Sequence, residues 1–258
     1  MPRSGQPALA AMLPKMERWA KLDDADRAAL LALPHRLRSM GATQYVVREG
    51  DVTEHCALLL SGFAFRSKIV GDGGRQIAAI HMKGDMVDLQ NSVLGIADHN
   101  VQALTPIEVA LIPRGAILEI AAAFPNVGRA MWHDTLVDGS VEREWIANVG
   151  RRDARTRMAH LLCEFALRLE AAGLGEQCDY ELPMTQDQLA DCLGLTPVHV
   201  NRTLKGLDAD QLITRTIRSV KIDNWERLAD AGDFNTTYLH VDLNGRSIDP
   251  MVPPRASS

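Results

Sequence analysis

The chain has 258 residues, of which 46% are hydrophobic and 24% are charged, and its formal net charge is −5. This length allows one to three domains, and the hydrophobic fraction is sufficient for buried cores. The negative net charge argues against a protein that coats nucleic acid indiscriminately, because such binding depends on summed phosphate neutralisation. Any contact with DNA is therefore expected to be local and made by a dimer.

The segments that would direct the chain to a membrane or out of the cell are not evident. No apolar run reaches the roughly 18 residues that would span a bilayer. The N-terminal stretch MPRSGQPALAAMLPKMERW carries charges and prolines where a signal peptide needs an unbroken apolar segment. We expect a cytoplasmic protein without membrane contact. The cysteines show no C-x-x-C spacing, so reduced structural thiols are expected and no zinc or iron–sulfur site is indicated; they are Cys56, Cys163, Cys178 and Cys192.

Residues 1 to about 40 predict a helical lead-in with a break near Pro34. Asp23 and Asp24 precede Leu30 and Leu31, and carboxylates favour the N-terminus of a helix. A packing role is expected for this segment.

From Gly41 to about Pro113, short β-prone runs alternate with Gly and Asp turns. Such spacing predicts a small antiparallel barrel or jelly roll, whose interior can hold one small ligand. The runs are 45–47, 57–60, 63–70, 76–82, 101–104 and 107–112.

A long helical stretch follows from Arg114, with a break at Pro125. It carries one narrow apolar line, and such a stripe often pairs with a copy of itself, so we predict a parallel dimer helix. The alternative is that the same stripe packs on the barrel. Gly150 is expected to interrupt the helix and Asp153 to cap the next one, which makes a hinge. The residues of the line are Met131, Val137, Val141, Trp145 and Val149.

The stretch 185–207, TQDQLADCLGLTPVHVNRTLKGL, predicts two short helices around a tight turn. Thr185 and Gln188 form a capping-box pattern, Gly194 suits the turn, and Thr196 followed by Pro197 starts the second helix. The stripe of Val200, Leu204 and Leu207 leaves a polar face unburied. We interpret the pair as a helix-turn-helix that enters a major groove, and the alternative is an ordinary helical hairpin in a core.

Two β-prone runs, 213–217 and 220–222, predict a two-stranded wing with outward Arg215, Arg218 and Lys221. Between Thr196 and Lys221 there are five Lys or Arg residues against two Asp, a local charge of 5 − 2 = +3. A basic patch on an acidic chain is typical of nucleic-acid contact. After Asp223 the chain is expected to dock as a C-terminal tail through Trp225, Leu228, Phe234, Tyr238 and Leu239, and residues 250–258 are expected to be disordered.

These expectations give an α+β protein with a β jelly roll, a long dimerisation helix and a C-terminal winged helix-turn-helix. The predicted boundaries are 1–123 for the lead-in and sensor barrel, 124–150 for the dimerisation helix, 151–235 for the DNA-binding domain and 236–258 for the tail.

This order resembles the Crp/Fnr family of bacterial transcription regulators, which includes the cyclic-AMP receptor protein and the fumarate-nitrate regulator. The resemblance extends over roughly residues 41–223. It rests on REGD at 48–51, LLLSGFAF at 58–65, GRQIAAIHMKGDMVDL at 74–89 and the stretch 185–207, and DNWERLAD at 223–230 resembles a subgroup. The resemblance implies that the N-terminal jelly roll is like that of cyclic-nucleotide-binding domains. It also implies a homodimer on a palindromic promoter site, with recognition helices about 34 Å apart. Contact with RNA polymerase is left open.

The sensor stretch departs from the family's pattern. Members that bind cyclic AMP share Gly-Glu and, further on, Arg-Ser or Arg-Thr, because a ribose hydroxyl needs an acceptor and a cyclic phosphate a bidentate cation. Here the nearest positions hold Asp88-Leu89 and Ala97-Asp98 or His99-Asn100, with no arginine between Arg75 and Arg114. Residues 1–55 lack the cysteine cluster of the oxygen-sensing members. Cyclic AMP and an iron–sulfur cluster are therefore disfavoured, the effector is unknown, and the candidate effector-pocket residues are Asp85, Asp88, His99 and Asn100.

The reading helix also departs, since Pro197-Val198-His199 stands where the cyclic-AMP receptor has Arg-Glu-Thr. We assign base edges to His199, Asn201 and Arg202, and the flanking backbone to Arg218 in the wing. Alternatively, His199 only completes the first helical turn. The full predicted set of DNA contacts is Thr185, Thr196, Pro197, Val198, His199, Asn201, Arg202, Lys205 and Arg218, with Thr196 and Lys205 on phosphates.

Two other functions remain as alternatives to this one. A barrel enzyme could bind a metal through His81 and His99, although these lack a His-x-His partner and a nearby glutamate. A regulator of the same fold could respond to oxidation of Cys192, and burial would make that thiol inert.

Overall fold

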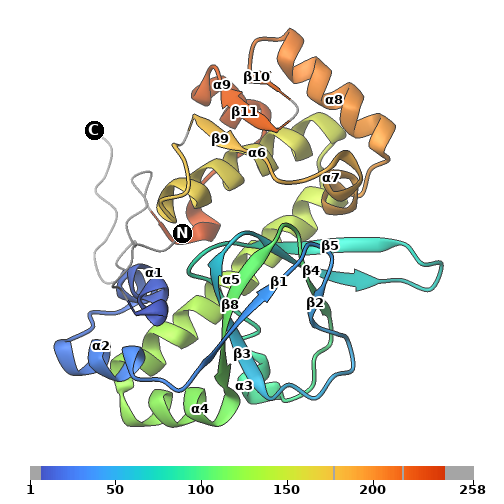
Figure 1. Ribbon diagram of the computed structural model, residues 1–258. Coiled ribbons are helices and arrows are strands. Elements are labelled where there is room, and N and C mark those ends of the chain that lie inside the picture. The colour runs from blue at the N-terminus through green and yellow to red at the C-terminus, as the bar shows by residue number, and fades with distance from the viewer. Residues whose placement is uncertain (1–6, 177, 217, 242–258) are drawn as a thin grey trace, which may run out of the picture.

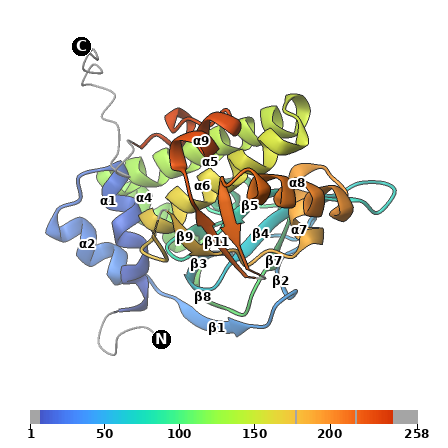
Figure 2. The same cartoon turned by 90° about the horizontal axis from the view of Figure 1, so that it is seen from above.

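The computed structural model describes residues 7–176, 178–216 and 218–241, and shows a barrel and a C-terminal domain with the helix α5 running between them (Figure 1). The N-terminal segment consists of η1 (Ala8–Met12), α1 (Leu13–Trp19) and α2 (Asp24–Leu31). Asp23 and Asp26 form a capping box at the start of α2. Figure 2 shows α1 and α2 on one side of the molecule and α8 on the opposite side.

The barrel is formed by two four-stranded antiparallel sheets. One has the order β1 (Arg36–Met40), β8 (Ile107–Pro113), β3 (His55–Ser61), β6 (Met86–Val87). The other has the order β2 (Tyr45–Val47), β7 (Asn100–Ala103), β4 (Ala64–Ile69), β5 (Arg75–His81), and the turn α3 (Asn91–Leu94) follows β6. The predicted jelly roll is confirmed.

The expected start of the barrel at Gly41 is wrong, because β1 begins at Arg36 and pairs with β8. Four of its five residues are exposed, so this edge strand has no apolar alternation from which to predict it.

The helices α4 (Arg114–Ala123) and α5 (Pro125–Arg151) meet at Phe124, as the proline predicted. The prediction that this stripe forms the dimer contact is wrong, because Met131, Val137, Val141 and Trp145 are buried and Val149 is half-buried within the same chain. A second apolar set on α5 faces outward instead: Trp132 is 69%, Leu136 54% and Ile146 72% exposed.

The hinge lies two residues later than predicted. Gly150 is inside α5, where a helical glycine costs about 1 kcal/mol and is tolerated. The chain becomes extended at Arg152, with ψ 151°, and α6 (Ala154–Ala171) begins after it. Asp153 caps α6 as predicted, by accepting a hydrogen bond from the Thr156 amide.

The C-terminal domain comprises α6 followed by β9 (Asp179–Glu181), α7 (Gln186–Leu193), α8 (Pro197–Ala209), β10 (Ile213–Arg215), β11 (Ser219–Ile222), α9 (Trp225–Ala231) and η2 (Thr237–Leu239). The wing has three strands in the order β10-β11-β9, so the predicted two-stranded wing lacked β9. Docking of the tail is confirmed, since Leu228, Tyr238 and Leu239 are buried. The disorder predicted for 250–258 lies outside the described residues. No described helix is long and apolar enough to cross a membrane.

Candidate DNA-reading face and sensor core

The turn between α7 and α8 is built as the sequence predicted. The Thr185 hydroxyl accepts from the Gln188 amide at 3.2 Å, and the Thr185 amide donates to the Gln188 side chain at 2.8 Å. Gly194 ends α7 with φ 62°, the left-handed conformation that glycine adopts without steric cost. The Thr196 hydroxyl accepts from the His199 amide at 3.3 Å and so caps α8.

The apolar stripe of α8 is buried and the opposite face is open. Val200, Leu204 and Leu207 are buried, whereas Val198 is 80% exposed. A hollow of about 520 Å³ lies on the open face, lined by Gln186, Pro197, Val198, Asn201, Arg202 and Lys205. The alternative of a helical hairpin buried in a core is therefore wrong.

Sequence reasoning missed Gln186, which lies at the start of α7 and lines this hollow. Its position directly after the cap Thr185 was the available signal. Arg202 donates to the Nε2 atom of His199, one turn away on α8. His199 therefore has a contact with a neighbouring predicted base-reading residue in addition to its place in the first turn. Thr185, Thr196 and Lys205 are exposed near this face, and Arg218 is exposed in the wing.

In the barrel, the imidazole of His99 lies between two carboxylates. Its Nε2 is 2.6 Å from Asp88 and its Nδ1 is 2.5 Å from Asp98. Only an imidazolium donates from both ring nitrogens, so this geometry fits a charged His99. Burial lowers the pKa of His99, but the hydrogen bond and charge of Asp88 outweigh it, and the pKa is raised above its ordinary value.

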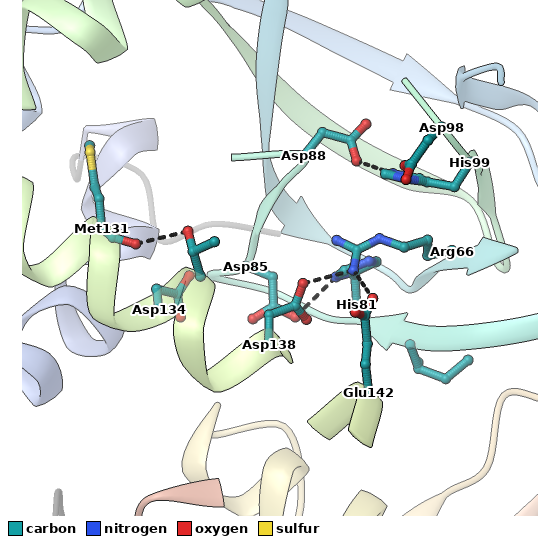
Figure 3. A network of polar contacts seen from close by, with 12 residues as sticks. Arg66, His81, Asp85, Asp88, Asp98, His99, Met131, Asp134, Asp138 and Glu142 are labelled. Atoms are coloured by element: carbon teal, nitrogen blue, oxygen red, sulfur yellow. Dashed lines mark hydrogen bonds and ion pairs between the residues drawn. The ribbon is translucent and has the colours of Figure 1, made fainter. Parts of the chain in front are cut away.

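Arg66 of β4 reaches from the barrel to α5, as Figure 3 shows. Its guanidinium is 2.7 Å from Asp138 and 2.7 Å from Glu142, and the residue is almost fully buried. Burial lowers the pKa of Arg66, yet Asp138 and Glu142 raise it above the ordinary value, so the group is a fixed cation. No local sequence pattern pointed to Arg66, because its partners lie 72 and 76 residues away.

The four predicted effector-pocket residues do not form one site. Asp88 and His99 pair with each other, and Asn100 accepts from the Glu49 amide. Asp85 lies apart from the Asp88–His99 pair (Figure 3), with 2.8 Å between its carboxylate and the Lys15 amine. Burial acts against ionisation of Asp85, but Lys15 and Arg168 prevail and hold its pKa at about 2. The prediction fails because Asp85 lies in the turn after β5, which faces α1 and α6 instead of the barrel interior.

Several buried polar atoms of the barrel have no hydrogen-bond partner among the described residues. They lie on β4, on β5, in the turn after β6 and in α3. The atoms are Arg66 Nε, Ser67 Oγ, His81 Nε2, Asp88 Oδ2, both side-chain polar atoms of Asn91, and Ser92 Oγ. Unpaired polar groups at such depth are costly, so each calls for water or a polar ligand atom. A separate crevice of about 1720 Å³ lies outside the barrel, between the N-terminal segment, α5 and α6.

His81 does not form a metal site in the described part of the chain. Its ring is buried 3.9 Å from Asp85, and burial together with Arg66 lowers its pKa to about 4. Among the described residues there is no group of three or more His, Cys, Asp or Glu that could bind a metal ion.

The thiol of Cys192 is buried, and its sulfur lies 3.9 Å from the Met184 sulfur. Burial raises the pKa of Cys192 far above its ordinary value. A protonated, enclosed thiol reacts slowly with oxidants, which counts against the redox switch.

The chain is similar to known proteins over both domains. Residues 37–124 match the family description of a cyclic nucleotide-binding domain, and residues 156–231 that of a Crp-like helix-turn-helix domain. The chain is 30% identical to the transcriptional activator protein FnrL of Cereibacter sphaeroides over 223 residues, which are 84% of this chain and 89% of that protein.

Two solved structures have the same fold. FixK2 from Bradyrhizobium japonicum superposes with a TM-score of 0.71 at 25% identity, over 77% of this chain and 98% of that one. A CooA mutant from Carboxydothermus hydrogenoformans gives a TM-score of 0.63 at 16% identity, over 86% of this chain and 95% of that one.

Proposed function

The chain belongs to the Crp/Fnr family of bacterial transcription regulators, and from this premise we propose that it reads a palindromic promoter site as a homodimer through the exposed face of α8. The observation that carries the proposal is the division of α8 into a buried apolar stripe and an open face with Asn201, Arg202 and Lys205. Arg and Asn side chains recognise guanine and adenine edges, and an exposed Val198 suits a thymine methyl group. We infer that the function is regulatory and not catalytic, and that the protein acts on DNA in the cytoplasm. RNA polymerase is the further partner that an activating role implies.

We propose that two copies pair through the outer face of α5. Trp132, Leu136, Gly139, Arg143 and Ile146 follow one another at steps of four, three, four and three residues. This is the spacing of a helix seam that packs against a parallel copy of itself. The helix so paired would present both copies of α8 on one side of the dimer.

The experiment is selection of bound sequences from random duplex DNA, followed by a salt-controlled gel shift on the enriched site. We expect a two-fold symmetric site. Arg202→Ala should weaken binding by about 1–3 kcal/mol and relax the preference at one base position of each half-site. Arg227→Ala is the matched control, because Arg227 is exposed on α9 away from the lined hollow. Binding that is indifferent to Arg202 would overturn its assignment.

We propose further that the effector is not cyclic AMP and that a small polar ligand or bound water satisfies the unpaired barrel groups. The support is the missing arginine between Arg75 and Arg114, together with the buried unpaired atoms of Ser67, Asn91 and Ser92. Native mass spectrometry of the purified dimer tests what the barrel retains. A saturable rise in melting temperature with cyclic AMP would contradict the proposal.

A further inference from the structure

The ten residues that follow the matched helix-turn-helix region fold back over the hinge. We propose that this strap, residues 232–241, is a positioning element that sets the angle of the DNA-binding domain on α5, and through it the spacing between half-sites that the dimer accepts. The inference rests on the proposed homodimer. The strap begins where the family match ends, at residue 231, and its segment η2 packs on α5 while α9, just before it, packs on α6.

At its start, the strap fixes the hinge residue itself. The Arg152 guanidinium is 2.9 Å from Asp233 and 2.7 Å from Glu144 of α5. The Gly232 carbonyl lies 3.1 Å from Nδ1 of His160 on α6. Arg152, the first of the two extended residues between α5 and α6, is thus tied to both the preceding helix and the strap.

In its middle, the strap joins α5 and α6 through one carboxylate. Glu164 of α6 is 1% exposed. It accepts from the Trp145 indole of α5 at 3.0 Å and from the Tyr238 hydroxyl of the strap at 2.8 Å, and Arg168 lies 3.2 Å away. The other side of the Tyr238 hydroxyl is 3.1 Å from Nε2 of His160. A buried carboxylate needs all its donors, so separation of the helices would leave a charge unsatisfied.

The end of the strap covers part of α5, which precedes the hinge in the chain. Leu239 and Val241 are buried, and Nε2 of His240 lies 3.3 Å from the Ser140 hydroxyl. The strap therefore contacts α5 at Ser140, and it contacts α6 at His160 and Glu164. Rotation about Arg152 has to break these contacts together.

This geometry bears on DNA because the angle at Arg152 places α8 relative to the dimer helix. Recognition helices of a dimer enter half-sites about one helical turn, roughly 34 Å, apart. A fixed angle makes the dimer selective for one spacing, and a free angle lets it accept neighbouring spacings.

The test compares gel-shift affinities for the selected site and for versions whose half-sites are one or two base pairs closer or further apart. In Tyr238→Phe, the preference of the full-length dimer for the selected spacing should fall by roughly tenfold, the equivalent of one hydrogen bond to a buried charge. Affinity for a single half-site should stay unchanged. A preference within about twofold of the parent protein, the scatter of neutral substitutions, would overturn the inference.

The matched control is Tyr180→Phe. Tyr180 is a buried tyrosine whose hydroxyl donates to the Leu162 carbonyl at 2.9 Å, inside the DNA-binding domain. It loses the same group without crossing the hinge, so it should keep the spacing preference even if it lowers stability.

Asp233→Asn serves as the second variant, because the Asp233 side chain is 76% exposed and its change leaves the core intact. It should loosen the preference in the same direction, and retention in both variants would overturn the inference even if one of them folds poorly. A parent protein that binds the site with no spacing preference also overturns it. A parent protein that binds no DNA at all fails the proposed function instead, so the two failures are distinguishable.

Discussion

The burial or exposure of single side chains on α8 was predictable, because a helix has a fixed period. Val200, Leu204 and Leu207 lie at steps of four and three residues, so their burial followed from the sequence, and so did the exposure of Arg202 and Lys205. Arg66 had no such signal, because its burial depends on carboxylates of another element. The sequence therefore predicts which side chains of a helix are exposed better than it predicts which charged groups meet inside the barrel.

Lys205 is expected to contact phosphate and not a base. In Lys205→Ala, binding should weaken by a similar factor on all sequences, and the slope of log affinity against log salt should decrease by about one. Gel shifts at several salt concentrations, on selected and unrelated duplexes, measure both quantities. Lys21→Ala, an exposed lysine in the N-terminal segment, is the control. Loss confined to the selected sequence would instead assign Lys205 to a base edge.

The pair of Asp88 and His99 should make barrel stability depend on pH. The pKa of His99 is raised in the folded chain, so its contribution is complete below the ordinary histidine pKa of about 6.5 and is lost as pH rises through the folded value. The free energy of unfolding should therefore decrease as the pH rises above about 6.5 and through the raised pKa of His99.

Urea unfolding at several pH values measures this dependence of the free energy of unfolding on pH. In His99→Gln the dependence should be weaker. The other groups that act on His99 are Asp98, which raises its pKa, and Arg66, which lowers it. A slope of unchanged size in His99→Gln would assign the dependence to other residues.

At the scale of the elements, α5 shows where a stripe pattern misleads. The apolar line from Met131 to Trp145 packs inside the chain. The outward seam has large apolar side chains at only three of its five positions, because Gly139 and Arg143 occupy the other two. Periodicity identifies an apolar face without identifying the surface that covers it. The alternative that the line packs on the barrel is correct only in part, because α5 packs on α1, α4 and η2 as well as on β5.

The helix α1 is held to the barrel and to α5 by one amine. Lys15 lies 2.8 Å from Asp85 and 2.9 Å from Asp134, and the Asp134 carboxylate also accepts from the Trp19 indole at 3.1 Å. Burial lowers the pKa of Lys15, but the two carboxylates raise it above the ordinary value.

Lys15→Met should destabilise the protein by about 3 kcal/mol, the lower end for a broken buried pair, because the Lys15 side chain keeps 27% exposure. The loss arises because Asp134 loses its ion pair with Lys15 and Asp85 keeps only the more distant Arg168, at 3.7 Å, as a charged ion-pair partner among the described residues. Urea unfolding measures it, and Lys15→Met combined with Asp134→Asn should recover part of the loss. A loss in the double variant equal to the sum of the single losses would show that the pair is not coupled.

At the scale of the whole molecule, the DNA-binding domain rests on the barrel as well as on the hinge. Arg75 of β5 is 2.7 Å from Asp191 of α7, and Nε2 of the Gln76 side chain donates to the Cys192 carbonyl at 3.2 Å. Arg168 of α6 donates to the Ile80 carbonyl at 2.6 Å. These contacts join residues 88 to 116 positions apart, so no local pattern could predict them. The order of the domains, in contrast, was predicted correctly from local patterns.

We proposed that two copies of the chain pair through the outer face of α5, and Ile146→Asp tests this pairing. Ile146 is 72% exposed in the single chain, so an aspartate there should leave the fold intact and place two like charges in the dimer interface. Sedimentation should show a folded monomer, and affinity for the two-fold site should fall toward that of a half-site. Leu118→Asp, an exposed leucine on the neighbouring helix α4, should remain dimeric. If Ile146→Asp sediments as a dimer and Leu118→Asp as a monomer, the copies pair through α4, and the two recognition helices need a different geometry to reach neighbouring half-sites.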